Sequence, residues 1–176
     1  MMHKLGLKFG LGALLVFLTV GCASQTIKGD ELYGDVDGFR IGEKADIPDE
    51  TQYREVIDVV VQYRKALVRK DVGALKRLIS TEYYDNAGST DTTDDDYGHD
   101  RLADIFEMMA NYADEIKYNV TVKRVQFKHK RALIDYEYEY AYKYDVGEKA
   151  TWDAGVEVNR LELVTEDGRW KIASGL

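Results

Sequence analysis

Four side chains form the best candidate for acid–base chemistry in this sequence: Asp85, Tyr136, Tyr138 and Arg160. Asp85 follows a short predicted strand and is the best-placed acid, while Arg160 lies at an apparent phase shift and could point to either face. A carboxylate beside phenol groups can exchange protons with a bound substrate. The simpler interpretation makes Asp85 a turn residue and Arg160 the partner of a surface acid, and the sequence favours it.

Both tyrosines belong to a strictly alternating stretch, Ala132–Tyr144. One side carries Ala132, Ile134 and five tyrosines, and the other carries mainly charged residues. A period of two indicates a strand with one sheltered and one wet face. The phenol row predicts a packed core, a small-molecule pocket or a protein-binding face. If it is a pocket, we expect it to be lined by Tyr118, Tyr136, Tyr138, Tyr140, Trp152 and Trp170, with no carboxylate on the inward side of the strands.

Three helices are predicted to support this strand. The first begins near Asp49 or Thr51, and its apolar residues recur at three- and four-residue steps through Leu67. Asp71 can cap a second, shorter helix, which a short strand at Tyr83-Tyr84 follows. The third helix spans Asp100–Asp114.

Four strands then complete the predicted domain. They cover residues 115–127, 132–144, 150–164 and the stretch around Trp170 and Ile172. The hydrophobic pattern changes phase at Lys123-Arg124 and again near Arg160. Such a shift within a strand indicates a β-bulge, which bends the sheet.

Composition and motifs exclude several classes of function. The formal net charge of −8 is unfavourable for nucleic acid, whose phosphates attract cations, so we expect no nucleic-acid partner. The single cysteine, Cys22, cannot form an intramolecular disulfide or a thiolate zinc site. No phosphate-binding loop, dinucleotide motif or metal-spaced histidine pair occurs. The sequence therefore predicts neither a cofactor nor a metal.

Two acidic segments resemble fragments of metal sites. Asp35–Gly38 has the spacing of the start of a calcium loop but lacks the remaining ligands, so we expect a turn. The segment 85–100 is rich in aspartate, but no register reproduces a calcium loop. We expect an acidic loop whose last aspartates favour the dipole of the following helix.

The amino terminus has the composition of a secretory signal. Lys4 and Lys8 precede an apolar run over residues 9–20 that is too short to cross a bilayer as a stable helix. With Gly21 before Cys22, the segment resembles a bacterial lipoprotein signal and lipobox, although Thr19 stands where that family prefers leucine. An ordinary signal peptide or an uncleaved anchor is the alternative.

The lipoprotein resemblance implies an acylated Cys22. Fatty acyl chains such as palmitate would then anchor the protein, since stable anchoring takes about two chains. Ala23 follows the cysteine, which by the sorting rule of enteric bacteria favours the outer membrane. We therefore expect a lipid-anchored protein of the cell envelope that faces the periplasm.

Three parts are predicted along the chain. Residues 1–21 are the lipoprotein signal peptide, residues 22–49 a flexible acidic tether, and residues 50–176 one folded domain. The tether is inferred because this stretch is polar, rich in glycine and acid, and without a lasting period. About 27 flexible residues have an r.m.s. span of roughly 28 Å.

The order of elements, with two short motifs, resembles the nuclear transport factor 2-like superfamily of the SnoaL-like kind. One motif is Tyr63–Leu67 running into Lys70–Leu75, where the family has a helix, an Asp turn and a second helix; the other is the ending Asp167–Ile172. The resemblance implies an α+β, cone-shaped (cystatin-like) fold with a curved antiparallel sheet wrapped around a long N-terminal helix. In this family the cone interior can be a core, a ligand pocket or an active site, so the fold does not decide function.

The favoured function is a non-catalytic domain that binds a small apolar or aromatic ligand, or a periplasmic partner. One alternative is a SnoaL-like enzyme that uses Asp85 and pocket tyrosines in proton transfer or hydration. Another is a structural envelope protein whose cone is filled. An enzyme is less favoured because no carboxylate or histidine is expected inside the cone.

The outer face of the sheet predicts the assembly state. It carries Asp135, Glu137, Glu139 and Lys143, and burying these charges in a sheet-to-sheet dimer costs desolvation. We therefore expect a monomer. Light scattering on a soluble form lacking residues 1–22 should give the mass of one chain, and a sheet-to-sheet dimer at micromolar concentration would contradict this.

Overall fold

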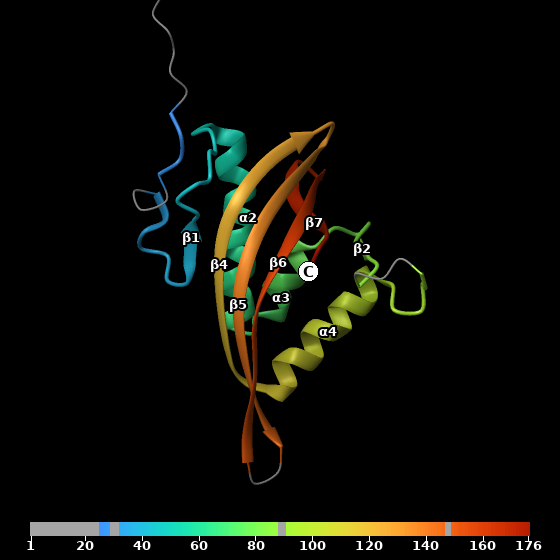
Figure 1. Cartoon of the computed structure of the whole chain (residues 1–176). Coiled ribbons are helices and arrows are strands. Elements are labelled where there is room, and N and C mark those ends of the chain that lie inside the picture. Colours follow the sequence, from blue (N-terminus) through green and yellow to red (C-terminus); the bar gives the residue numbers. More distant parts are fainter. Residues whose placement is uncertain (1–24, 29–31, 88–90, 147–148) are drawn as a thin grey trace, which may run out of the picture.

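A five-stranded sheet in the order β1-β4-β5-β6-β7 curves around one long helix (Figure 1). The computed structural model describes residues 25–28, 32–87, 91–146 and 149–176. The strands are β1 (Phe39–Ile41), β4 (Ala113–Lys128), β5 (Arg131–Val146), β6 (Lys149–Glu166) and β7 (Arg169–Ser174). The concave side holds α2 (Thr51–Val68), α3 (Val72–Leu78) and α4 (His99–Tyr112), and a separate pair is formed by β2 (Tyr84–Asp85) and β3 (Tyr97–Gly98).

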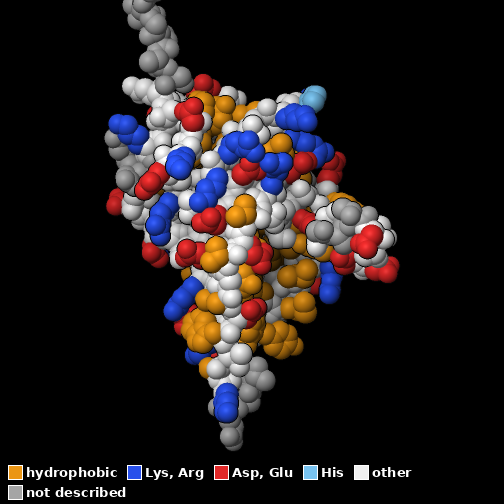
Figure 2. Space-filling view, viewed as in Figure 1, with side chains coloured by type: hydrophobic (Ala, Val, Ile, Leu, Met, Phe, Trp, Pro, Cys, Tyr) orange, Lys and Arg blue, Asp and Glu red, His pale blue; other side chains and the backbone are white. Residues whose placement is uncertain are grey.

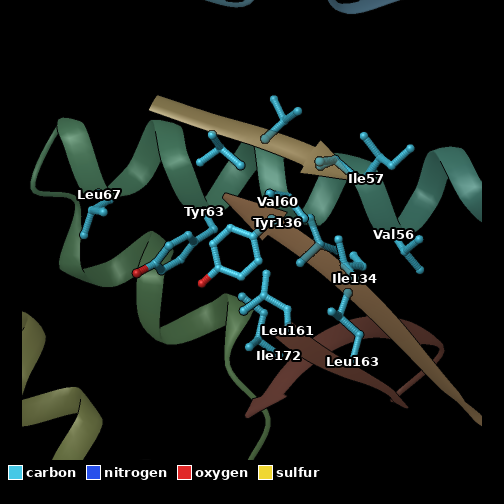
Figure 3. Packing of buried hydrophobic residues seen from close by; sticks show 14 of the residues in the cluster. Val56, Ile57, Val60, Tyr63, Leu67, Ile134, Tyr136, Leu161, Leu163 and Ile172 are labelled. Atoms are coloured by element: carbon cyan, nitrogen blue, oxygen red, sulfur yellow. The ribbon is translucent and has the colours of Figure 1, made fainter. Parts of the chain in front are cut away.

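The predicted apolar stripe of α2 packs against the sheet. Val56, Ile57 and Val60 are at most 1% exposed, and Val56 and Val60 lie on the side of the helix that faces Ile134 of β5 and Leu161 of β6 (Figure 3). Burying a side chain of this size contributes about 1.5–3 kcal/mol. This packing fixes the helix on the concave side, so the α+β architecture expected from the sequence is confirmed.

Two helix starts differ in how they are capped. Asp71 accepts a hydrogen bond from the backbone N of Ala74 at 2.8 Å, which confirms its predicted role as a cap. The N-cap position of α2 is Glu50, without a side-chain cap. Asp49 instead forms an ion pair with Arg54 at 2.6 Å.

One of the two predicted bulges is present as expected. The β4–β5 register shifts between Val122 and Arg124, which confirms the bulge at Lys123. The prediction of a bulge near Arg160 is wrong, because β5 pairs with β6 without a register shift from Arg131 to Val146. The shift on this side of the sheet lies in the β6–β7 pairing, between Glu162 and Leu163.

The segment before α2 is part of the fold. β1 pairs in parallel with β4, and Ile27, Phe39 and Ile47 are buried. Gly38 adopts a φ of +66°, and a Cβ there would lie 2.3 Å from a guanidinium nitrogen of Arg64. The prediction of a flexible tether is therefore wrong for the described residues between 25 and 49, because buried apolar side chains at irregular spacing hold them in place.

The other N-terminal predictions have different outcomes. Residues 1–21 and Cys22 lie outside the described residues. Asp35–Gly38 forms turns, as expected. None of the helices in the described part of the chain has the length and the apolar composition that a membrane-spanning helix requires.

Glu166, at the end of β6, joins the sheet to the loop before β2. Its carboxylate forms an ion pair with Lys171 at 3.0 Å and accepts hydrogen bonds from Ser80 Oγ at 2.8 Å and the backbone N of Thr81 at 3.0 Å. The bond from Lys171 is the largest cause that lowers the pKa of Glu166 from 4.5 to about 2, followed by the bond from Ser80.

A carboxylate with a depressed pKa in the folded protein stabilises the fold above its unfolded pKa, and this stabilisation disappears as the pH falls through the folded value. We expect Glu166→Gln to lower the free energy of unfolding by roughly 1–2 kcal/mol at pH 7. The difference from the natural protein should shrink as the pH falls from about 4.5 toward about 2. Urea unfolding at pH 7 and pH 3 measures both values.

The matched control is Glu82→Gln, an exposed acid in the same loop, which should change stability little at either pH. An equal loss for Glu166→Gln at both pH values would show that the ionised carboxylate is not the source of the effect.

Candidate functional site

The phenol row of β5 runs from the core to the surface. Tyr136 is 2% exposed, whereas Tyr138, Tyr140, Tyr142 and Tyr144 are half-buried. Consecutive rings lie 5.4–6.3 Å apart between centroids, from Tyr136 to Tyr144. Such spacing suits offset stacking of aromatic rings. The row is thus a continuous aromatic surface with only its inner end in the core.

The inner end of the row is filled with side chains. Tyr118 of β4 and Tyr63 of α2 are buried beside Tyr136, and Figure 3 shows the rings of Tyr63 and Tyr136 side by side. The hydroxyl of Tyr136 donates to the carbonyl oxygen of Gly175 at 3.0 Å. Tyr118 and Tyr136 are therefore core residues, and only the half-buried tyrosines can meet a ligand.

Strand β6 places two carboxylates beside the phenols, against prediction. Tyr138 lies opposite Glu157 and Tyr142 opposite Asp153, and residues opposite one another share a face of the sheet. The hydroxyl of Tyr138 donates to Glu157 at 2.5 Å. Between the two acids, Gly155 leaves room for the ring of Tyr140, since a Cβ there would lie 2.9 Å from its hydroxyl.

The apolar residues of the same half-strand lie on the outer face. Trp152 lies opposite Lys143 and is 44% exposed, with the ammonium of Lys117 4.9 Å from its ring centroid. The prediction of Trp152 as a pocket-lining residue is therefore wrong. The unbroken register that places Glu157 inward also places Trp152 outward.

Trp170 is also away from the phenol row. It belongs to β7 and contacts Phe127 at 5.8 Å between ring centroids, near the turn that joins β6 to β7. Trp170 therefore does not line a pocket with the β5 tyrosines.

A groove of about 830 Å³ opens beside Tyr138, the half-buried tyrosine next to the inner end of the row. We call it the tyrosine groove. It lies between β6, the β2–β3 pair and residues 174–176. Its lining includes Tyr84, Asp85, Tyr97, Tyr138, Glu157, Asn159 and Arg160.

The predicted pair of Asp85 and Arg160 is not formed. Asp85 accepts hydrogen bonds from the backbone N of Gly175 at 2.7 Å and of Ala87 at 2.9 Å. The guanidinium of Arg160 binds Asp135 on the outer face at 2.5 Å. Although both residues line the tyrosine groove, Asp85 acts as a turn and anchoring residue and Arg160 as the partner of a surface acid. These contacts favour the simpler interpretation of both residues.

Electrostatics keep the phenols protonated. Burial, followed by the hydrogen bond to Glu157, raises the pKa of Tyr138 well above its usual range. Burial and the neighbouring Tyr144 raise the pKa of Tyr142 to about 12. At neutral pH these hydroxyls are therefore hydrogen-bond donors, and Glu157 is the acceptor nearest to Tyr138.

The outer face is less uniformly charged than predicted. On β5, Asp135 is bound by Arg160 and Arg124, whose hydrogen bonds lower its pKa. On β6, however, Val156 and Val158 are 64% and 72% exposed. Figure 2 shows hydrophobic side chains gathered over the narrow lower half of the molecule and charged ones over the upper half. The monomer stays a prediction.

Comparisons with known proteins identify the fold. No family model and no curated protein matches the sequence. A candidate dehydratase of the nuclear transport factor 2-like family from Streptomyces avermitilis has a TM-score of 0.57 at 15% identity, over 71% of this chain and 94% of that one. A candidate scytalone dehydratase from Novosphingobium aromaticivorans has a TM-score of 0.55 at 15% identity, over 70% and 80%.

A protein from Kribbella flavida gives a TM-score of 0.59 at 14% identity, over 71% of this chain and 88% of that one. This chain has the nuclear transport factor 2-like fold. The fold predicted from the order of elements is therefore confirmed, and the site must be argued from this chain's own residues.

Proposed function

We propose that the protein is a lipoprotein of the outer membrane, facing the periplasm, whose tyrosine groove binds a small aromatic ligand without transforming it. The location rests on the charged and apolar amino terminus ending at Cys22. The binding role rests on one observation above all: the half-buried phenol of Tyr138 is held by Glu157 in an open groove. A ring can stack on such phenols, and Glu157 can accept a hydrogen bond from a donor on the ligand.

We propose binding without a reaction because of the contacts that Asp85 makes and because of the residues that line the tyrosine groove. Asp85 is engaged by two backbone N–H groups. The described residues that line the groove include no histidine. These features favour binding over proton abstraction by Asp85.

A second candidate function is proton transfer by the Tyr138–Glu157 pair. Two solved structures of similar fold are named as candidate dehydratases, and the pair joins a proton donor to an acceptor at 2.5 Å. In this alternative Glu157 would be the base and the Tyr138 hydroxyl the donor.

Ligand binding is tested by native mass spectrometry of the protein purified from its own cells, and by calorimetric titration with tyramine, which carries a ring and hydrogen-bond donors. We expect a co-purifying small molecule and 1:1 binding of tyramine. Glu157→Gln should weaken tyramine binding about tenfold, since a charged hydrogen bond is worth about 1.5 kcal/mol. Glu139→Gln, on the outer face, should not change it.

The binding role would be abandoned if neither measurement detects a ligand, or if Glu139→Gln weakens binding as much as Glu157→Gln. Turnover of a bound ring compound that is lost in Glu157→Gln would favour the second candidate.

Anchoring is tested separately by replacing Cys22 with serine. We expect the natural protein in the outer-membrane fraction and Cys22→Ser in the soluble fraction, because the acyl chains supply the anchoring energy. Metabolic labelling with palmitate should mark only the natural protein. Membrane retention of an unlabelled Cys22→Ser protein would contradict the lipid anchor.

A further inference from the structure

A second groove, of about 840 Å³, lies between α2, α3 and the β6–β7 end of the sheet. Its walls are one face of α2, the helix α3, and the β6–β7 turn with the start of β7. We call it the basic groove. Five basic residues line it: Lys65, Arg69, Arg77, Arg169 and Lys171.

The cations of this groove are largely available to a ligand. Lys171 is bound to Glu166. Within the described part of the chain, the side chains of Lys65, Arg69, Arg77 and Arg169 form no ion pair shorter than 4.0 Å. The chain as a whole has a net charge of −8, so a cluster of unpaired bases is unusual for this molecule.

The acids of the groove are fewer, and two of them are already hydrogen-bonded. Asp58 accepts from the hydroxyl of Tyr33 at 3.3 Å, and Asp71 caps α3. Glu55 and Asp58 lie in the first half of α2, whereas Lys65 lies seven residues beyond Asp58, about 10 Å along the helix. Glu55 and Asp58 thus lie toward one end of the groove, and Lys65 and Arg69 toward the other, where Asp71 caps α3.

Stabilisation of helix ends does not account for all five basic residues of the basic groove. Cations near a helix C-terminus interact favourably with its dipole, which explains Lys65 on α2 and Arg77 on α3. It does not explain Arg169, which belongs to β7 and converges on the same space. Three separate elements therefore direct cations toward one groove.

The groove also has an apolar wall. Val59, Ala66, Ala74, Leu78 and Trp170 line it beside the bases. A cavity of this volume with apolar walls and a few charged groups is typical of small-molecule sites. The guanidinium group suits phosphate because its planar fork can donate two parallel hydrogen bonds.

We propose that the basic groove binds a small soluble anion that combines a phosphate with an apolar group. The phosphate lies among Lys65, Arg69 and Arg77, and the apolar group lies against Trp170. An anionic membrane surface fits less well, because Glu55 and Asp58 share the groove and would be repelled by it.

Calorimetric titration of the full chain in a neutral detergent with phenyl phosphate tests this proposal. We expect one phenyl phosphate per chain, bound more weakly as salt is raised. The double variant Arg69→Gln with Arg77→Gln should weaken binding at least tenfold, and replacement of both by lysine should restore part of it. The control, Lys44→Gln with Lys128→Gln, removes the same charge from exposed sites elsewhere and should leave binding unchanged.

Three results would overturn the proposal. The first is no binding of phenyl phosphate at millimolar concentration, and the second is an equal loss in the control variant. The third is binding to phosphatidylglycerol vesicles, lost in the arginine variant, without binding of phenyl phosphate; this would assign the groove to a membrane surface. Circular dichroism of each variant verifies that the fold is retained.

Discussion

Burial of the apolar stripe of α2 in the curved sheet is the constraint on which the other features depend. Val56 and Val60 face Ile134 and Leu161 with almost no exposure, and such close packing tolerates little change in volume. Because α2 is fixed in this way, one wall of the basic groove is held against the sheet, whereas the tyrosine groove is formed by β6, the β2–β3 pair and residues 174–176. The two have opposite electrostatic character, since the first carries acids and phenols and the second mainly bases.

The parts of the fold that the sequence predicted are those with long, repeated patterns. The stripe of α2 repeats over five turns, and the alternation of β5 repeats over thirteen residues, so errors at single positions do not matter. Asp71 and the bulge at Lys123 were also predictable, because each is a local feature: one caps a helix start and the other interrupts an otherwise regular alternation.

Two parts of the structure were missed, one because β6 was assigned a bulge and one because it depends on a long-range contact. In the first half of β6 the apolar residues lie on the outer face, so the sequence predicted Trp152 inward and no carboxylate beside the phenols, and Glu157 was missed. Extending the alternation back from Leu161 without a bulge would have placed Glu157 beside Tyr138. β1 is only three residues long and depends on Gly38 fitting against Arg64, a long-range contact that composition does not reveal.

The early start of the fold limits how far the protein can stand from a membrane. The backbone of Gln25 already accepts a hydrogen bond from Asp49 at 2.6 Å, and only three peptide steps separate Cys22 from Gln25, at most about 11 Å of chain. If Cys22 is acylated as proposed, the body of the molecule must lie directly against the lipid headgroups. A partner embedded in the peptidoglycan would then have to come to the bilayer to meet it, because the protein could not extend across the periplasm.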